Sequence, residues 1–261
     1  MKLSIYQIDA FAKAVFCGNP AAVVPLDQWF SDNLMQAIAQ ENNLSETAFF
    51  VEENGSFHIR WFTPVAEVDL CGHATLAAAH CLYHHRGYHK EEIVFKSRKG
   101  DLIVQPSSQG YKMNFPTDSF VKTNDPHNLL SQGLKIDVSE CYLGTDDYMV
   151  VLADQEDVST IKPDFNIIEK LRARGVIVTA KGKDVDFVSR AFFPAFGINE
   201  DPVTGSAHTL LTPYWAGRLG KNILSARQIS ARGGELFCEL VGDRVEISGE
   251  AKTFLQGEIM I

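Results

Sequence analysis

The stretch 66-AEVDLCGHATLAAAH-80 decides the fold, and 197-GINEDPVTGSAHTLL-211 repeats its shape later in the chain. Each stretch runs from acidic residues through a glycine into a long apolar segment. The apolar segment at 74–84 has little polarity on any side, so it predicts a helix that is buried all round. Two such helices need two sets of strands to enclose them.

Four short patterns recur in the same order in the two halves of the chain. The first two are Arg-x-Phe-x-Pro, at 60–64 and 190–194, and an acidic patch followed by a glycine, which is Gly72 in one copy and Gly205 in the other. The other two are a basic or glycine-rich helix end, at 84–90 and 217–221, and an Arg-then-Gly turn, at 97–104 and 230–237. The copies lie about 130 residues apart throughout. A constant offset of this kind indicates two copies of one supersecondary unit.

Strand and turn patterns surround the predicted helices. The N-terminal segment 2–11 alternates like a strand, and Asn54-Gly55 predicts a hairpin between strands at 47–52 and 57–62. A second hairpin is expected around Gly100. Ser31 is expected to cap a helix that reaches Gln40.

These elements predict an α+β fold with two pseudo-symmetric lobes. Each lobe is expected to be a curved, mostly antiparallel sheet or barrel around one central helix. The polar segment 117–128 contains Pro126 and is the best boundary in the sequence. It divides the chain into an N-terminal lobe, 1–118, and a C-terminal lobe, 119–261, whose last strand can pack on the N-terminal lobe.

Composition limits the function classes. The chain has 261 residues, a net charge of −9 and no Lys/Arg run, so nucleic acid is not an expected partner. No stretch approaches the roughly 18 apolar residues of a membrane span, and the N-terminus does not resemble a signal peptide. Five cysteines without a CxxC pattern favour reduced thiols, and we expect a cytoplasmic protein.

The two helix starts are candidate anion sites. A helix start has unpaired backbone N–H groups and a partial positive charge, and small residues let an anionic group approach them. Gly72, Gly205 and Ser206 offer such an approach, so we expect a small substrate with a carboxylate. If the lobes face each other, both helix starts open into one cleft. The alternative is that each glycine only packs against a neighbouring strand.

Three residues near these starts are candidates for proton chemistry. Glu46 stands where a polar turn enters an apolar strand, and partial desolvation there suits general acid/base catalysis. His73 follows Gly72, where the helix dipole is expected to lower its pKa and keep the ring neutral. Asp201 is expected either to orient a substrate or to cap the helix. For Glu46 and His73 the alternatives are a solvated turn acid and a structural histidine.

Several motifs together resemble the PhzF-like isomerases, a family that shares a duplicated fold with diaminopimelate epimerase. They are NPAAVV at 19–24, NLSETAFF at 43–50, RWFTP at 60–64, DLCGHATLAAAH at 69–80 and EDPVTGSAH at 200–208. The resemblance covers nearly the whole chain. It implies an isomerase that needs no cofactor or metal and is typically a homodimer.

The resemblance also implies roles for individual residues. Glu46 would be the catalytic acid/base, and His73 and Asp201 would hold the substrate and assist proton movement. The residues Gly72, Gly205 and Ser206 would bind a substrate carboxylate.

The second helix start departs from the two-cysteine pattern of the diaminopimelate-type epimerases. Cys71 lies at the first start, but the equivalent position in the second copy is Thr204. The difference favours proton relocation by a single acid over racemisation by two thiols. Racemisation or epimerisation of an amino acid, and a non-catalytic binding protein of the same fold, stay as alternatives.

Two further hypotheses concern the helix histidines and Cys71. His80 and His84 are four residues apart on one predicted helix, a spacing that can hold a metal, but no acidic third ligand is expected near them. Cys71 with His73 would suit a cysteine hydrolase, but residues only two apart at a helix start are not expected to contact one another readily.

Overall fold

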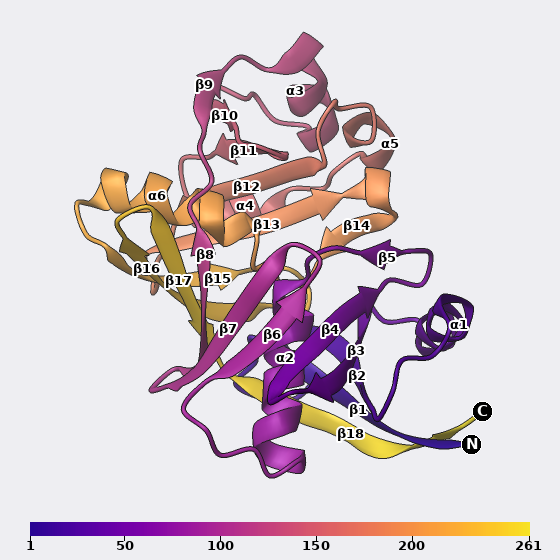
Figure 1. The fold of residues 1–261 in the computed structure, drawn as a ribbon. Helices are drawn as coiled ribbons and strands as arrows, with labels where there is room; N and C mark the ends of the chain where they lie inside the picture. The colour runs from indigo at the N-terminus through magenta and orange to yellow at the C-terminus, as the bar shows by residue number, and fades with distance from the viewer. The chain divides into compact units, whose positions relative to one another are not determined.

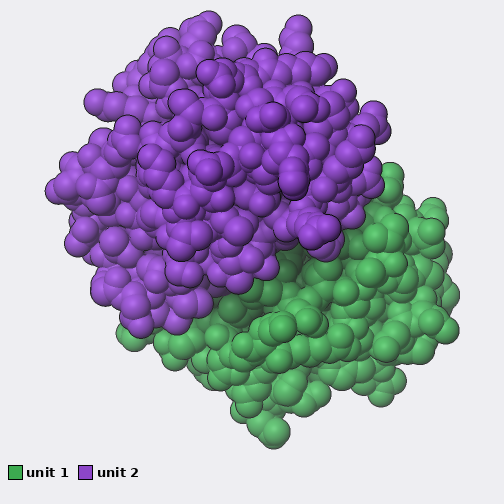
Figure 2. Space-filling view, turned by 90° about the horizontal axis from the view of Figure 1, so that it is seen from above, with its two compact units in different colours: residues 1–114, 248–261 green, residues 115–247 purple.

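The computed structural model describes all 261 residues and divides into two compact units, each traced in Figure 1 and coloured separately in Figure 2. Unit 1 comprises Met1–Asn114 and Ser248–Ile261, and unit 2 comprises Phe115–Ile247. The division therefore falls before the polar segment 117–128, which belongs to unit 2. The chain passes between the units inside a continuous strand rather than through a polar linker, and its last segment returns to unit 1.

Unit 1 is built on one long sheet. Its strands, in spatial order, are β18 (Ala251–Met260), β1 (Lys2–Ala10), β2 (Asn19–Leu26), β3 (Glu46–Glu53), β4 (Ser56–Phe62), β6 (Ile93–Ser97), β7 (Gly100–Ser107) and β8 (Gly110–Pro116), with the short β5 (Glu67–Val68) also on β4. All neighbours are antiparallel except two pairs, β2 with β3 and β4 with β6. The two ends of the chain run side by side in β1 and β18 (Figure 1).

The helix α2 (Gly72–His85) is the core of unit 1. It packs against β1, β2, β3 and β18, and every residue from His73 to Leu82 is buried. The predicted all-round burial of this helix is confirmed as far as Leu82, whereas His84 at the end of the predicted segment is exposed. The shorter α1 (Asp32–Asn42) instead buries one face, Met35, Ile38 and Ala39, and Ser31 caps it by accepting a hydrogen bond from Leu34 N–H.

Unit 2 has the same kind of architecture. Its strands are β9 (Val121–Thr123), β10 (Cys141–Leu143), β11 (Asp147–Val151), β12 (Gly175–Lys181), β13 (Phe187–Phe193), β14 (Ile198–Asp201), β15 (Ile223–Gln228), β16 (Gly234–Val241) and β17 (Arg244–Gly249). Its helical segments are η1 (Pro126–Asn128), α3 (Leu129–Leu134), α4 (Gln155–Thr160), α5 (Phe165–Ile168), η2 (Pro194–Phe196) and α6 (Ala207–Leu219). The central helix here is α6, whose Trp215 donates to Thr179 Oγ1 on β12 and stacks on Phe187.

The two units repeat one topology. In unit 2 the paired strands β10, β11, β12, β13, β15 and β16 are joined in turn by antiparallel, parallel, antiparallel, parallel and antiparallel pairings. In unit 1 the strands β1, β2, β3, β4, β6 and β7 show the same order of pairings. The Arg-x-Phe pattern has the same role in both. Arg60 forms a two-point ion pair with Glu67 and lies 5.1 Å from the Phe62 ring, and Arg190 does so with Glu200, 5.0 Å from Phe192. The predicted duplication is confirmed.

None of the helices combines the length and the apolar character needed to cross a membrane. No disulfide joins any of the five cysteines.

Candidate active site

A tight turn between α1 and β3 positions Glu46. Helix α1 ends at Asn42, and Asn43 adopts a left-handed conformation with φ 49°, which an asparagine tolerates better than most residues. Ser45 then donates to the Asn19 side chain over 3.2 Å, and Asn42 donates to Thr47 Oγ1 over 3.1 Å. These contacts fix both sides of Glu46, whose own side chain is only 12% exposed at the start of β3.

The first turn of α2 positions a thiol and an imidazole. Cys71 is the N-cap residue, in an extended conformation, and its side chain makes no capping hydrogen bond. Its carbonyl accepts hydrogen bonds from the Thr75 N–H at 3.1 Å and from the Thr75 hydroxyl at 2.6 Å. The Cys71 carbonyl thus begins the hydrogen bonding of the helix, and Gly72 separates Cys71 from His73 in the sequence.

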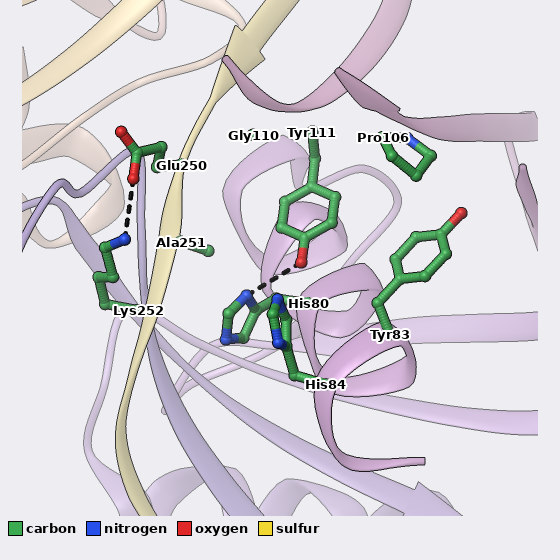
Figure 3. A pocket seen from close by; sticks show the side chains of 9 residues that line it. All are labelled: His80, Tyr83, His84, Pro106, Gly110, Tyr111, Glu250, Ala251 and Lys252. Atoms are coloured by element: carbon green, nitrogen blue, oxygen red, sulfur yellow. Dashed lines mark hydrogen bonds and ion pairs between the residues drawn. The ribbon is translucent and has the colours of Figure 1, made fainter. Parts of the chain in front are cut away.

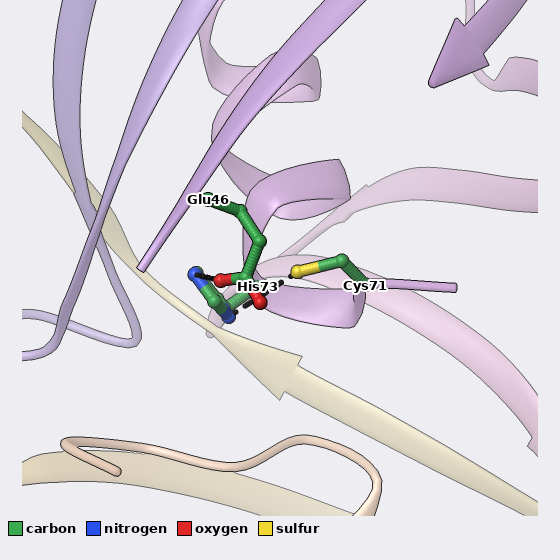
Figure 4. Close-up of side chains that lie close together, drawn as sticks. All are labelled: Glu46, Cys71 and His73. Carbon is green, nitrogen blue, oxygen red and sulfur yellow. Dashed lines mark hydrogen bonds and ion pairs between the residues drawn. The ribbon is translucent and has the colours of Figure 1, made fainter. Parts of the chain in front are cut away.

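Glu46, His73 and Cys71 converge at this helix start (Figure 4). His73 Nε2 lies 3.1 Å from Glu46 Oε2, and His73 Nδ1 lies 3.5 Å from Cys71 Sγ. The sequence argument that Cys71 and His73 do not readily make contact is therefore wrong. The extended backbone of Cys71 turns the sulfur toward the ring of the residue two positions later.

The contact between Glu46 and His73 is close, but it is not a complete hydrogen bond. Glu46 Oε2 and His73 Nε2 are both buried, and neither has a hydrogen-bond partner in spite of the 3.1 Å separation. Distance is satisfied, so the angle must be unfavourable. Buried polar atoms without partners are uncommon and costly, so this pair of atoms needs a physical explanation.

The charges at the site shift the pKa values of both the His73 ring and the Cys71 thiol. Burial alone would lower the pKa of His73, but the Cys71 sulfur and the Glu46 carboxylate together raise it well above its ordinary value. The predicted lowering of the His73 pKa is wrong, because these groups touch the ring while the helix dipole is only about half a charge. Burial raises the pKa of the Cys71 thiol to about 11, with the Glu46 carboxylate adding to the effect.

The start of α6 in unit 2 is organised by hydrogen bonds. Asp201 ends β14 and accepts a 2.5 Å hydrogen bond from the Thr204 hydroxyl. Gln228 donates to the Asp201 carbonyl at 2.8 Å and accepts from Thr204 N–H at 2.9 Å. The structure therefore brings Asp201 to the segment that carries Gly205 and Ser206, next to the first residue of α6.

The residues of both helix starts lie within the segment that matches one protein-family model. The model of the phenazine biosynthesis-like protein family matches residues 8–257. The chain belongs to this family. The predicted resemblance to the PhzF-like proteins is confirmed.

Relatives of this phenazine biosynthesis-like chain match it over its full length. A Pseudomonas aeruginosa protein named an uncharacterized isomerase is 51% identical over 259 residues, 99% of each chain. A crystal structure of a PhzF-family protein from Enterococcus faecalis is 48% identical, with a TM-score of 0.95 and all of both chains covered. A hydroxyproline epimerase from Agrobacterium vitis is only 8% identical but has a TM-score of 0.61 over 99% of this chain and 92% of its own. That likeness shows a shared epimerase-type fold.

The α6 start of this family member also contains a cation that sequence reasoning missed. Arg174 forms an ion pair with Asp147 and donates to Ser206 Oγ over 3.1 Å. Because the Ser206 oxygen accepts from Arg174, its own hydrogen is available to another acceptor. Gly175 is the first residue of β12, as Glu46 is the first residue of β3, and Arg174 immediately precedes Gly175. A strand-by-strand comparison of the two copies is therefore the one signal that marks Arg174.

The histidines at the other end of α2 line a separate pocket of about 330 Å³ (Figure 3). Both ring nitrogens of His80 are engaged, one with Tyr111 at 3.2 Å and one with Thr253 at 3.0 Å. An acid, Glu250, does line this pocket, contrary to expectation, but it pairs with Lys252 at 2.8 Å. The hydrogen bonds of His80 argue against the metal site considered for His80 and His84.

Proposed function

We propose that this chain is an isomerase that relocates a proton on a small, carboxylate-bearing metabolite, with Glu46 as the proton carrier. The observation that supports the proposal most is the contact between Glu46 Oε2 and His73 Nε2, two buried atoms that are 3.1 Å apart and lack hydrogen-bond partners. A carboxylate held in this way on rigid elements suits general acid/base catalysis. The full-length relatives named as isomerases support the same class of reaction.

The proposed reaction needs only proton transfers. Glu46 takes a proton from an acidified carbon of the substrate, so a C–H bond breaks and an O–H bond forms. The electron pair spreads into the neighbouring unsaturated group as an enolate- or enamine-like charge. Glu46 then returns the proton to another atom, or to the same carbon, and nothing is oxidised or reduced. We propose that no cofactor takes part.

The neighbouring groups would stabilise the charges in this reaction. A protonated His73 places a positive charge beside the carboxylate that exchanges the proton. The backbone N–H groups around Gly72 can bind an anionic group at the start of α2. Asp201, Gly205 and Ser206 are proposed to hold the substrate from the α6 start. Two statements stay predictions: one chamber serves both helix starts, and the enzyme is a homodimer.

Cys71 supports a second candidate. A thiol 3.5 Å from His73 is a second possible acid/base group at the same helix start, and two groups are what an epimerase or racemase requires. The first proposal is favoured because burial raises the pKa of Cys71 to about 11, which keeps the thiol from acting as a base near neutral pH. Replacing Cys71 by Ala distinguishes the two, since only epimerisation by two groups would be abolished.

The test is deuterium incorporation from D2O into a panel of small carboxylic acids that carry an acidic C–H bond. We expect the wild-type protein to introduce deuterium into at least one acid, as read by mass spectrometry. Glu46→Gln should reduce the rate by a factor of about 100 or more, since general acid/base groups contribute about 10² to 10⁴. Glu52→Gln is the matched control, because Glu52 lies exposed on the same strand. Near-wild-type exchange by Glu46→Gln would refute the role of Glu46.

A further inference from the structure

The Glu46 cluster contains three different metal-binding groups. One ligand atom each from Glu46, Cys71 and His73 can be chosen so that all three lie within 4.8 Å of one another. A carboxylate, a thiolate and an imidazole are the side chains that bind Zn²⁺ in proteins. Three protein ligands with a fourth position open is the usual composition of an accessible zinc site.

Two of the donor atoms at this site have no hydrogen bond to the rest of the chain, and the third, Cys71 Sγ, contacts only His73 Nδ1 among the side chains, at 3.5 Å. His73 Nε2 and Glu46 Oε2 are buried and lack hydrogen bonds, and the His73 side chain is only 7% exposed. Two donors about 2.0–2.1 Å from one tetrahedral ion lie about 3.3 Å apart. The observed separation of 3.1 Å between these two atoms is close to that value. One bound ion would thus satisfy both buried atoms with little movement.

The scaffold limits how far the ligands can move. Glu46 stands at the start of β3, and Cys71 and His73 belong to the first turn of α2, which packs against that strand. Ligands on packed strands and helices hold a metal more precisely than ligands on loops. The Cys71 sulfur contacts His73 Nδ1, so it has to turn toward Nε2 to share an ion with Glu46. It can do so because it makes no hydrogen bond that caps the helix.

We propose that Glu46, Cys71 and His73 bind one thiophilic divalent cation, Zn²⁺ or Cd²⁺, and that this ion switches the isomerase off. On binding, the Cys71 S–H bond and the N–H bond of the ligating His73 nitrogen break, both protons leave to solvent, and sulfur–metal and nitrogen–metal bonds form with no change of oxidation state. The ion would occupy the carboxylate that carries the proton and the imidazole beside it. The inhibition rests on the proposed function, whereas the binding does not.

The ligand set also predicts selectivity. Mg²⁺ and Ca²⁺ need six or more oxygen ligands, and the cluster supplies one carboxylate. A thiolate favours Zn²⁺ and Cd²⁺ over these hard ions. We therefore expect Zn²⁺ at roughly micromolar concentration to fill the site, and Mg²⁺ at roughly millimolar concentration to leave it empty.

The binding test uses metal alone, without substrate. Chelator-treated protein is titrated with Zn²⁺ against a chromophoric zinc indicator, and one ion per chain is expected. Cys71→Ser should weaken binding at least tenfold. The matched control is His84→Gln, because His84 is exposed at the opposite end of α2 and should leave the affinity unchanged. Equal affinity in Cys71→Ser and the wild type, or no binding at all, would overturn the site.

A second readout protects the test if Cys71→Ser does not fold. Co²⁺ bound to the wild-type protein should show a thiolate-to-metal charge-transfer band in the near ultraviolet, and its absence would contradict the site. The regulatory half is measured separately, as loss of deuterium incorporation when Zn²⁺ is added and recovery when a chelator removes it. Retained exchange with the metal bound would refute inhibition, and exchange by no acid in the panel would count against the proposed function while leaving the binding result intact.

Discussion

Glu46 Oε2 lies 3.1 Å from His73 Nε2, although Glu46 opens a strand and His73 belongs to the first turn of the central helix. The two residues are held there by different means. The left-handed Asn43 and the Ser45–Asn19 hydrogen bond set the position of Glu46, and the all-round burial of α2 sets the position of His73. The contact between Glu46 and His73 is thus a product of packing between two rigid elements.

Shortening the Glu46 side chain by one methylene tests how strongly the exchange rate depends on the position of the carboxylate. Glu46→Asp keeps the charge but withdraws the carboxylate by about the length of one C–C bond. A displacement of about 1 Å can cost about 100-fold in rate, so we expect deuterium incorporation to slow by that order of magnitude with an unchanged unfolding temperature. Glu52→Asp serves as the control. A rate within about twofold of wild type would mean that Glu46 does not carry the proton.

The cysteines should differ sharply in reactivity. Burial raises the pKa of Cys71 to about 11 and those of Cys81 and Cys238 to about 12, whereas Cys17 is exposed. Because the thiolate is the reactive form, iodoacetamide at neutral pH should modify Cys17 first and leave the four buried cysteines largely intact, as mapped by peptide mass spectrometry.

The same experiment addresses a cysteine nucleophile. Exchange activity should survive modification of Cys17, and Cys71→Ala should retain activity within about tenfold, since the loss of a general acid/base group typically costs more. Alkylation of Cys71 as fast as Cys17 would instead restore the hydrolase hypothesis, because it would require an activated thiolate beside His73.

The sequence predicted the parts of the fold that depend on pattern. The lack of a polar face at 74–84 predicted the buried central helix, and four short patterns at a constant offset, Arg-x-Phe-x-Pro among them, predicted the duplication. The structure explains the second success physically. Arg60 and Arg190 each join an acid to an aromatic ring within their own unit, so the pattern records one packing arrangement made twice.

Features that depend on three-dimensional contacts were not predictable in this way. The contact between Cys71 and His73 depends on the extended backbone of Cys71, φ −147° and ψ 105°, which no sequence spacing specifies. The pKa of His73 depends on charges in contact with the ring, which outweigh a helix dipole. Arg174 belongs to no sequence motif, and only a strand-by-strand comparison of the two copies and its contact with Ser206 mark it.

The α6 start offers a test of the proposed anion site. Gly205→Val adds a branched side chain beside the backbone N–H groups of the first turn, so a substrate carboxylate should be held at least tenfold more weakly. KM for the exchange substrate is the measurement. Gly217→Val on the same helix is the control, because an added Cβ there meets no atom within 4 Å. An unchanged KM in Gly205→Val would argue against anion binding at this helix start.

The last prediction concerns acid stability and His208. Its Nδ1 contacts the Thr204 carbonyl at 2.8 Å, as a donor, while its buried Nε2 has no partner. Burial lowers the pKa of His208 from 6.5 to about 4, with the hydrogen bond to Thr204 opposing the shift. The folded state therefore favours the neutral ring, whose stabilising effect is complete above pH 6.5 and is lost as the pH falls toward 4.

Each pH unit in that window corresponds to about 1.4 kcal/mol, so His208 should account for a loss of about 3 kcal/mol in the free energy of unfolding. His208→Asn keeps a donor near the Thr204 carbonyl but cannot titrate, so urea unfolding between pH 6.5 and 4 should show a shallower decline than in the wild type. His89→Gln, at an exposed position, should follow the wild-type slope. Parallel declines in wild type and His208→Asn would show that His208 is protonated in the folded protein well above pH 4, contrary to its burial.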